Sequence, residues 1–276
     1  MGIIELVPPI ELIAIDLDGT LLSSDESVST ANVRALRRAM DEGVRIVLAT
    51  GRGLSTPRAL AVELGLNAPV IAAHGALTVD AADGTEVDHC PIPAEYANEI
   101  LVDAQHNGHA VAIYRDGIFY RRRGTPVFMA DMVPPHWREV DDLLAPELAP
   151  ASMLRALGAD AVEAISGKYA HLPIFFRIER WGNFVECAMT DIHATKHRAL
   201  ERLCAMYGIS SDRVMAIGDS PNDVPMMEFA RLGVAMGNAS DEVKKAADIV
   251  TSTCDEDGVA AVIEQYVLSD RKRRSA

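Results

Sequence analysis

The residues with the clearest chemical potential are Asp16-Leu17-Asp18-Gly19-Thr20, which follow directly on the apolar run Leu12 to Ile15. Four apolar residues are enough for a buried β-strand, and such a strand would deliver both carboxylates to the edge of a sheet. Alternation along an extended strand end points Asp16 and Asp18 the same way. Two acids facing one pocket suggest a metal ion, an acid-base pair, or both. Asp, Gly and Thr are also ordinary turn residues, so the remaining sequence has to separate a site from a turn.

Three further predicted strands also end in polar residues. Thr50-Gly51 follows the apolar run 44–49, His74 follows the run 69–73, and the segment 219–223 follows the run 213–217. Helical patterns lie between these strands, which predicts βαβ units and a parallel sheet. Because the carboxyl ends of parallel strands meet at one edge of a sheet, residues about 200 positions apart can share one pocket.

Four carboxylates would meet at this edge, namely Asp16, Asp18, Asp219 and Asp223. Such crowding is strongly repulsive, which favours a hard divalent cation among them, and ligands that are all oxygen favour Mg²⁺. The alternative for residues 220–223 is a helix start, with a capping side chain and an early proline. That alternative explains one acid but not the convergence of four.

A phosphoryl group is a ligand that this edge can hold. A phosphate dianion about 4 Å from Asp16 would be repelled by on the order of 8 kcal/mol at an effective dielectric constant of about 20, so positive charge is needed. Mg²⁺ would supply part of it and Lys196, at the start of a predicted helix, would supply more. Backbone N–H groups after Asp16 and at Gly51, with the Thr50 hydroxyl, can hold phosphoryl oxygens. Taken alone, Lys196 favours a solvated helix position.

The order of the predicted elements gives an α/β fold with two parts. Residues 1–86 and 189–276 carry the strand-helix alternation of a doubly wound parallel sheet, which is a Rossmann-like core. Residues 87–188 contain hairpin signals such as Asp116-Gly117, helices over 94–105 and 159–165, and a proline-rich stretch without clear periodicity over 124–150. We therefore expect residues 87–188 to form an α+β domain inserted into the core.

Composition narrows the partners and the compartment. The chain of 276 residues has 40 acidic and 26 basic side chains and a formal charge of −14, which repels nucleic acids and anionic membranes. No segment has the roughly 18 uncharged apolar residues that a membrane span needs. The four cysteines show no CxxC spacing, which favours neither zinc nor a disulfide framework and makes a cytoplasmic location the default. A disulfide between Cys90 and Cys187, at the two predicted domain crossings, stays an open alternative.

Taken together, these motifs resemble those of the haloacid dehalogenase superfamily of phosphatases. The matching residues are Asp16-Leu17-Asp18-Gly19-Thr20, Thr50-Gly51-Arg52, Lys196, and Gly218-Asp219-Ser220-Pro221-Asn222-Asp223, in that order along the chain. The insertion between the second and third motifs resembles the cap of the Cof-type (subclass IIB) sugar-phosphate phosphatases. Further similarity lies in residues 237–244 and 255–260, so that the resemblance spans essentially the whole chain.

The resemblance implies a mechanism through an aspartyl-phosphate intermediate. Asp16 would attack phosphorus, and Asp18 would protonate the leaving alcohol and then deprotonate the attacking water. Mg²⁺ would be bound by the Asp16 carboxylate, the Asp18 backbone carbonyl and Asp219, with Asp223 supporting the metal shell. The phosphate would be held by Leu17, Thr50, Gly51, Lys196 and Asn222.

Two positions depart from the family pattern. The third strand usually ends in Asn-Gly-Ala but here ends in His74-Gly75-Ala76, and the lysine usually lies in Ser-Lys-Gly but here lies in Thr195-Lys196-His197. Neither change removes a catalytic group. His74 is read as structural, because a histidine at a pocket rim is often only a hydrogen-bonding side chain.

The expected function is hydrolysis of a small phosphorylated metabolite, with a sugar phosphate as the leading class, by a monomer or small homo-oligomer. The inserted domain would act as a lid that sets specificity, and its candidate contact residues are Tyr114, Arg115, His136, Trp137 and Arg177. Two alternatives stay open at this point. A hexose-phosphate mutase would use the same intermediate, and a phospho-accepting receiver module would use similar residues without a domain-sized insertion.

Overall fold

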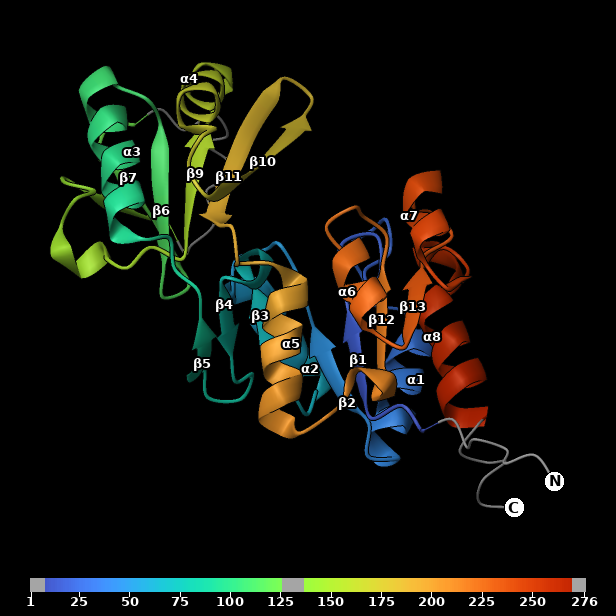
Figure 1. The fold of residues 1–276 in the computed structure, drawn as a ribbon. Coiled ribbons are helices and arrows are strands. Elements are labelled where there is room, and N and C mark those ends of the chain that lie inside the picture. Colours follow the sequence, from blue (N-terminus) through green and yellow to red (C-terminus); the bar gives the residue numbers. More distant parts are fainter. Residues whose placement is uncertain (1–7, 126–136, 270–276) are drawn as a thin grey trace.

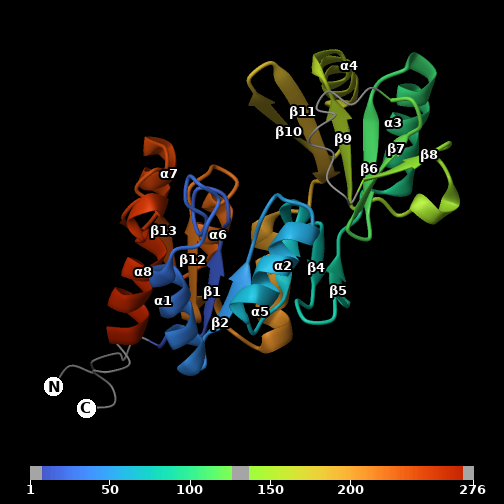
Figure 2. The same ribbon diagram turned by 180° about the vertical axis from the view of Figure 1, so that it is seen from behind.

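The structure is a computed structural model that describes residues 8–125 and 137–269. It contains two bodies of secondary structure, drawn one above the other in Figure 1 and from behind in Figure 2. The lower body is built on a five-stranded sheet and the upper body on a six-stranded sheet. The two polypeptide crossings between them follow β5 (Glu86–His89) and β11 (Phe184–Asp191). The α/β fold class with a second, inserted sheet is therefore confirmed.

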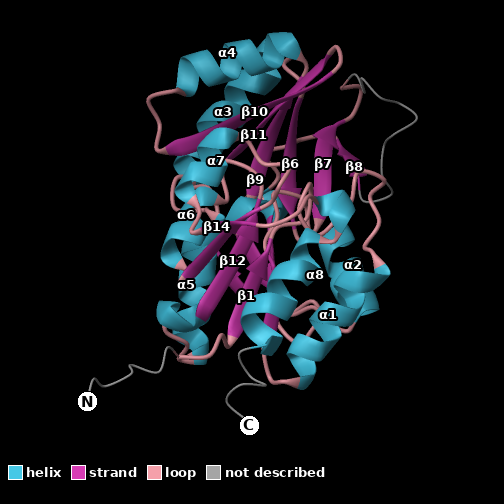
Figure 3. Ribbon diagram, turned by 90° about the vertical axis from the view of Figure 1, so that its right-hand side faces the viewer, coloured by secondary structure: helices cyan, strands magenta, loops and turns pink. Residues whose placement is uncertain are grey.

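The five-stranded sheet has the order β14-β13-β12-β1-β2, and its strands pair in parallel. Figure 3 shows it between two helical layers, with α5, α6 and α7 on one side and α1, α2 and α8 on the other. The elements of this body are β1 (Leu12–Ile15), α1 (Thr30–Asp41), β2 (Arg45–Leu48), α2 (Ser55–Leu64), α5 (Lys196–Tyr207), β12 (Val214–Gly218), α6 (Val224–Phe229), β13 (Leu232–Ala235), α7 (Asp241–Ala246), β14 (Ile249–Val250) and α8 (Gly258–Ile263).

Burial on both faces explains the unbroken apolar strands. Ile13 and Ile15 of β1 pack in one core cluster with α1 and α8, whereas Leu12 and Ala14 pack in another with α5 and α6. Period-two alternation thus sends neighbouring residues of one strand into two different cores. This arrangement is the doubly wound core that the sequence predicts. It also leaves the carboxyl ends of β1, β2 and β12 as the only parts of these strands that carry polar side chains toward a shared edge.

A short three-stranded sheet extends the core beyond β2. Its strands are β3 (Val70–Ala72), β4 (Leu77–Val79) and β5, and they pair in antiparallel order. A single parallel bridge between Ala49 and Ile71 connects β3 to the end of β2. Strands β4 and β5 form a hairpin, and the expected domain boundary at residue 87 falls inside its second strand.

The six-stranded sheet, called the cap sheet below, has the order β10-β11-β9-β6-β7-β8. Helices α3 and α4 pack on one of its faces around Ile113, Leu154 and Met189. The opposite face, with Ala112, Tyr114 and Ala188, packs toward residues near β4. The elements are α3 (Ala94–Asn107), β6 (Val111–Arg115), β7 (Ile118–Arg122), β8 (Trp137–Val140), β9 (Met153–Leu157), α4 (Ala159–Tyr169), β10 (Ile174–Trp181) and β11 (Phe184–Asp191).

Some details of the fold differ from the sequence prediction. The stretch 124–150, expected to be irregular, contains the strand β8, which pairs in parallel with β7. The last helical segment, from Gly258 to Leu268, changes from α to π geometry at Glu264. Cys90 and Cys187 are free thiols, so the alternative of a disulfide between them is wrong. Among the described residues, no helix has the length and apolarity to cross a membrane.

Tyr114 links the cap sheet to the core by a hydrogen bond. Its ring is fully buried in β6, and its hydroxyl accepts a hydrogen bond from the backbone N–H of Leu54, just before α2. Burial raises the pKa of this hydroxyl to about 12, although the bond from Leu54 acts in the opposite direction. The hydroxyl therefore stays protonated and neutral at physiological pH.

We expect Tyr114→Phe to lower the free energy of unfolding by about 1 to 3 kcal/mol, because the Leu54 N–H loses its partner in a partly buried place. Urea denaturation followed by circular dichroism measures this change. Tyr120→Phe, on the neighbouring strand β7, is the matched control, since the Tyr120 hydroxyl bonds no residue in the described parts of the chain. Equal stability of the two variants would contradict a linking role for Tyr114.

Candidate active site

A cavity of about 640 Å³ lies between the polar edge of the core and the cap sheet. Its core side is formed by residues that follow β1, β2, β3 and β12, and its cap side by residues of β7, β8, β9, β10 and β11. The parallel sheet thus brings together the strand ends that the sequence marks as polar. The lining residues are Asp16, Asp18, Glu26, Gly51, Arg52, Gly53, Ser55, Thr56, His74, Phe119, Trp137, Arg155, Glu179, Glu186, Ala188, Lys196, Ser220 and Asn222.

Lys196 forms the electrostatic centre of the core side. Its Nζ lies 2.5 Å from Asp16 Oδ1 and 2.7 Å from Asp223 Oδ1, and only 2% of the lysine side chain is exposed. Burial lowers the pKa of this ammonium, but the two carboxylates outweigh burial and hold the pKa above its ordinary value. Lys196 is therefore a fixed positive charge, and the alternative of a solvated helix lysine is excluded by its burial.

A close backbone contact places Lys196. Thr195 caps helix α5, its side chain accepting from the Arg198 N–H, and Lys196 is the first residue of the helix. Gly75 lies against this helix start: a Cβ atom on Gly75 would come within 2.2 Å of the Thr195 carbonyl oxygen, and its φ is +103°. Only glycine combines this φ with such close approach. The His74-Gly75-Ala76 turn and the lysine are therefore fixed relative to each other.

Three carboxylates converge beside Lys196. One oxygen each of Asp16, Asp219 and Asp223 lies within 4.8 Å of the others. Gly19 and Gly218 make room for this cluster, because a Cβ on Gly19 would come within 2.4 Å of Asp219 Oδ2 and one on Gly218 within 2.5 Å of the Asp223 carboxyl carbon. The glycines next to the acids therefore serve packing as well as turning.

The hydrogen bonds of these acids separate a supporting residue from possible ligands. Asp223 Oδ1 accepts from Lys196, and its Oδ2 accepts from the backbone N–H groups of Asp219 and Ser220. Asp219 makes only long contacts, at 3.2 to 3.5 Å, with Thr20, Ser220 and Asn238. Asp219 and the second oxygen of Asp16 are thus the carboxylate groups best able to accept a cation, while Asp223 holds the backbone around them.

The electrostatics of the cluster fit a divalent cation. Burial raises the pKa of the Asp16 carboxyl above its ordinary value, Lys196 opposes this, and Asp223 adds to it. Burial and the charge of Asp223 also raise the pKa of Asp219. One lysine faces three carboxylates, so that a further positive charge would stabilise their ionised forms. Carboxylate oxygens in this number suit Mg²⁺.

Asp18 occupies a different environment from Asp16. Both line the cavity, but the side chain of Asp18 is 54% exposed and that of Asp16 only 6%. Arg52 donates to both oxygens of Asp18 from Nε, at 2.9 and 3.0 Å, and also from Nη2. Arg52 lies within 3.7 Å of Glu26 as well. Asp18 is therefore accessible from the cavity and from solvent, and Arg52 orients it.

The residues expected to bind phosphate surround Asp16. Leu17 and Thr50 are fully buried, and the Thr50 hydroxyl accepts from the Arg52 N–H at 3.0 Å. Gly51 and Asn222 line the cavity, and Asn222 Oδ1 is buried without a hydrogen-bond partner among the described residues. An unpaired buried polar atom is costly, so a ligand group that donates a hydrogen bond to this oxygen would stabilise the complex.

His74 lies deeper than the sequence suggests. It is 5% exposed, its backbone has φ of 61°, and its ring lies against Gly51, where a Cβ would come within 2.3 Å of Cε1. Burial, with the positive charges of Arg177, Lys196 and Arg155, lowers its pKa well below the ordinary value. His74 is therefore a neutral imidazole, and its Nδ1 has no partner among the described residues.

The other candidate contact residues of the cap divide between the cavity and elsewhere. Trp137 lines the cavity, Tyr114 makes the bond to Leu54, and Arg177 donates to Thr190 at 2.8 Å. Arg115 binds Asp116 and the Pro150 carbonyl away from the cavity lining. His136 lies outside the described residues.

Sequence reasoning missed several residues of the site. Arg52 was part of a recognised motif but had no assigned role, and its position two residues after Thr50 is the signal that could have found it. Asn238 donates to the Gly19 carbonyl at 2.8 Å and reaches Asp219. Arg155 and Glu186 carry no local motif, because only the pairing of β9 with β11 brings them together.

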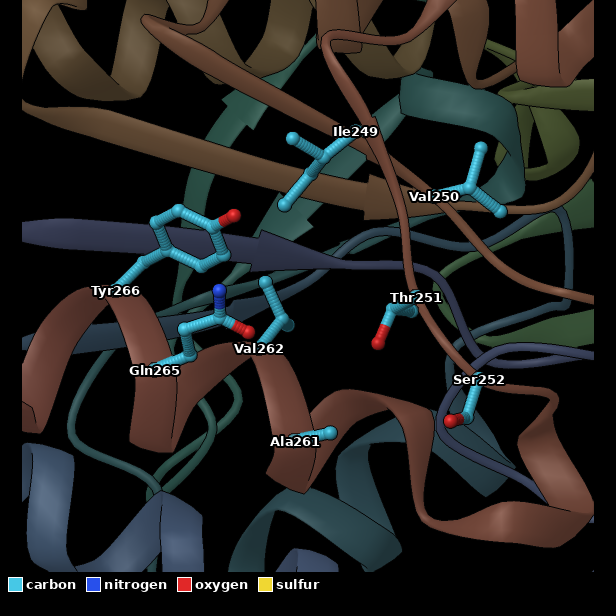
Figure 4. Close-up of a pocket in the computed structure, with 8 residues that line it drawn as sticks. All are labelled: Ile249, Val250, Thr251, Ser252, Ala261, Val262, Gln265 and Tyr266. Carbon is cyan, nitrogen blue, oxygen red and sulfur yellow. The ribbon is translucent and has the colours of Figure 1, made fainter.

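A second pocket, shown in Figure 4, lies between the edge strand β14 and helix α8. Apolar side chains, hydroxyls and one amide line it, and Tyr266 is its only titratable group. It offers no carboxylate, amine or imidazole for acid-base or metal chemistry. The acid, lysine and amide side chains that follow the strand ends lie instead in the cavity between core and cap.

Comparison with known proteins points to one family. The sequence model of the haloacid dehalogenase-like hydrolases matches residues 13–263. The chain is 34% identical, over 94% of its own length and 96% of the relative's, to 5-amino-6-(5-phospho-D-ribitylamino)uracil phosphatase YcsE of Bacillus subtilis (strain 168).

Solved structures give the same result. The phosphatase BT1666 from Bacteroides thetaiotaomicron superposes with a TM-score of 0.78 at 29% identity, over 95% of this chain and 98% of that one. The sugar phosphatase BT4131, described as subclass IIB, superposes with a TM-score of 0.75 at 21% identity, over 93% and 98% of the two chains. The latter likeness concerns the fold alone.

The neutral state of His74 predicts a pH-dependent stability. The unfolded chain binds a proton at this residue below its ordinary pKa of about 6.5, whereas the folded chain does not, so folding loses stability as pH falls below that value. His74→Asn removes the effect and keeps a residue that tolerates positive φ. Between pH 6.5 and 5.5 we expect wild type to lose about 1 kcal/mol more than the variant in urea unfolding, because the unfolded histidine is already half protonated at pH 6.5. Parallel losses in both proteins would contradict a buried neutral imidazole.

Proposed function

We propose that this chain, which belongs to the haloacid dehalogenase-like hydrolases and is a phosphatase of small phosphorylated molecules, has the subclass IIB cap of the Cof-type group. We further propose that it is Mg²⁺-dependent and works through an aspartyl-phosphate on Asp16. The observation that carries this proposal is the buried Lys196, which donates to Asp16 Oδ1, while Asp16 lines the cavity. A carboxylate fixed in this way is oriented for in-line attack.

We assign the cation to a defined set of ligands. Asp16, Asp219 and the backbone carbonyl of Asp18 would hold Mg²⁺, and Asp223 would support them through its bonds to the Asp219 and Ser220 N–H groups. When bound, the cation neutralises charge on the phosphoryl oxygens and on the carboxylates. Leu17, Thr50, Gly51, Lys196 and Asn222 would bind the phosphate, through backbone N–H groups, the hydroxyl, the amide and the ammonium.

In the first chemical step, the free oxygen of Asp16 forms a bond to phosphorus while the bond between phosphorus and the ester oxygen breaks. Asp18 gives its proton to the departing oxygen, so the alcohol leaves neutral. For this the Asp18 carboxyl must first separate from Arg52, which binds both of its oxygens in the structure, and take up a proton from solvent. Substrate phosphate is an alternative partner for that guanidinium.

In the second step, a water molecule attacks phosphorus and the bond to Asp16 breaks. Asp18 now accepts a proton from that water, which restores both carboxyl groups to their starting states and releases inorganic phosphate. The exposure of Asp18 at the cavity, at 54% of its side chain, suits a group that must meet both an alcohol and a water.

The substrate that we propose is a phosphate ester of a sugar or of a sugar-derived chain. The relative YcsE is named for a substrate with a phosphorylated ribityl chain, and BT4131 is named a sugar phosphatase. We further propose that residues 87–188 form the specificity cap on a core of residues 1–86 and 189–276. The four free cysteines suit a reducing compartment such as the cytoplasm.

Phosphate release tests hydrolysis against the mutase alternative, because both reactions share the aspartyl-phosphate. With excess glucose 6-phosphate, ribose 5-phosphate or D-ribitol 5-phosphate and Mg²⁺, we expect one free phosphate for each ester consumed. A colorimetric phosphate assay and chromatography of the esters measure the two quantities. An isomeric ester that accumulates without free phosphate would contradict the phosphatase and support a mutase.

Asp16→Asn should abolish turnover while the protein stays folded, since the amide keeps the shape of the carboxyl but cannot attack phosphorus. We expect kcat to fall by at least about 1000-fold, the scale on which enzymes lose activity with their nucleophile. Asp212→Asn, at an exposed position outside the cavity lining, is the matched control and should keep its activity. Substantial turnover by Asp16→Asn, with phosphate released, would exclude the covalent scheme.

A further inference from the structure

The face of the cap sheet without helices carries a group of charged and aromatic side chains toward the cavity. Arg155 of β9 and Glu186 of β11 lie on the same face as Tyr114 and Ala188, which pack toward the core. Phe119 of β7 and Trp137 of β8 join them. Arg155, Glu186, Phe119 and Trp137 all line the cavity, together with Asp16 and Asp18 on the core side. This group, Arg155, Glu186, Phe119 and Trp137, is called the roof below.

Arg155 and Glu186 form a fixed pair of a donor and an acceptor. Arg155 Nη1 lies 3.2 Å from Glu186 Oε1 and 3.3 Å from Oε2, and Glu186 is 4% exposed. Burial raises the pKa of Glu186, while Arg155 lowers it and so favours its charged form. The cost of removing both charges from water offsets most of the attraction in a buried ion pair. Stability therefore does not explain this pair in the cavity wall, and a role in binding does.

Part of this polar wall lacks partners among the described residues. Arg155 Nε is buried without a hydrogen bond, and so is His74 Nδ1 on the facing core side. Glu179 lies directly opposite Glu186 on β10, with no ion pair to a residue in the described ranges, so that two carboxylates face each other. Like charges directly opposite on a sheet are destabilising, and unmade buried hydrogen bonds are costly. A ligand with both donors and acceptors would relieve these costs.

Flat rings lie beside this ion pair. Phe119 stacks on Trp137 with ring centroids 4.9 Å apart and planes at 17°, and the Arg155 guanidinium lies 4.9 Å from the Phe119 centroid. Phe119 is nearly buried, whereas Trp137 is only partly buried and lines the cavity. Trp137 therefore offers an aromatic surface on which a second flat ring can stack.

We propose that the roof is a subsite for a flat nitrogen-containing ring on the leaving alcohol, whose carbonyl accepts from Arg155 and whose neighbouring N–H donates to Glu186 while the ring stacks on Trp137. A ring carbonyl can accept from the guanidinium while the neighbouring ring N–H donates to the carboxylate. A flat ring can also stack on the flat face of Trp137. This inference rests on the proposed phosphatase function and adds to the sugar-derived chain a second recognition element. Hydrolysis itself needs only the core side of the cavity.

A matched pair of esters tests the subsite. 5-Amino-6-(5-phospho-D-ribitylamino)uracil and D-ribitol 5-phosphate share the phosphorylated chain and differ in the ring. We expect wild type to have a higher kcat/KM for the ring-bearing ester. Glu186→Gln and Trp137→Leu should each lower that value by about 10- to 100-fold, the range expected when a charged hydrogen bond is lost, and should change kcat/KM for D-ribitol 5-phosphate by less than about 3-fold.

The control is Glu163→Gln, which makes the same chemical change on an exposed position of α4 and should behave as wild type. Equal kcat/KM values of wild type for the two esters, or an equal loss on both esters in the roof variants, would overturn the subsite while leaving the phosphatase intact. If neither ester released phosphate, the result would count against the proposed function instead.

Calorimetry with the unphosphorylated alcohol, 5-amino-6-(D-ribitylamino)uracil, then tests the roof without catalysis. We expect wild type and Glu163→Gln to bind it and Glu186→Gln to bind about 10-fold more weakly or not at all. Binding of equal strength by all three proteins, or by none of them, would overturn the subsite. The folded state of each variant is checked by circular dichroism before comparison.

Discussion

The buried ammonium of Lys196 between Asp16 and Asp223 is the interaction on which the site depends. Charges removed from water are costly unless each has a partner, and here one lysine serves two acids at 2.5 and 2.7 Å. Lys196 begins α5, Asp16 follows β1 and Asp223 lies after β12. In the sequence, Asp16 is 180 residues and Asp223 is 27 residues from the lysine. The ion pairs therefore connect the first strand of the core to the elements that follow the insertion, and they form only when the parallel sheet is assembled.

The same constraint separates the two acids of the first motif. Asp16 is buried beside Lys196, whereas Asp18, two residues later, is half-exposed and paired with Arg52. A nucleophile needs a fixed position and a charged form, and a proton carrier needs access to water. Asp16 follows β1 directly, whereas Asp18 lies two residues further along, next to the turn that Gly19 makes with φ of +72°. Their difference in burial is thus a direct result of where β1 ends.

Sequence reasoning could predict those parts of the molecule that follow from periodicity and strand ends. Unbroken apolar runs predicted β1, β2 and β12, and the rule that parallel strands share an edge predicted that Asp16 and Asp219 would meet. It could not predict β8, since its residues show no alternation and pair only with β7 in space. It also gave His74 a rim position, whereas the ring is buried because Gly51 leaves room for it. Contacts between distant elements, such as Arg155 with Glu186, leave no local pattern to read.

The two sides of the cavity differ in how rigidly the fold determines them. The core side is held by ion pairs, backbone hydrogen bonds and glycines that tolerate no side chain, so most changes there disturb several groups at once. The cap side is the open face of a sheet, on which alternate residues can change without moving the backbone. Tyr114, whose hydroxyl accepts from the Leu54 N–H, links that face to the core, while its neighbours on the sheet remain free to vary. On the proposed function, substitutions at positions such as 137, 155 and 186 can therefore change which leaving group binds, while the core side of the cavity that binds phosphate stays the same.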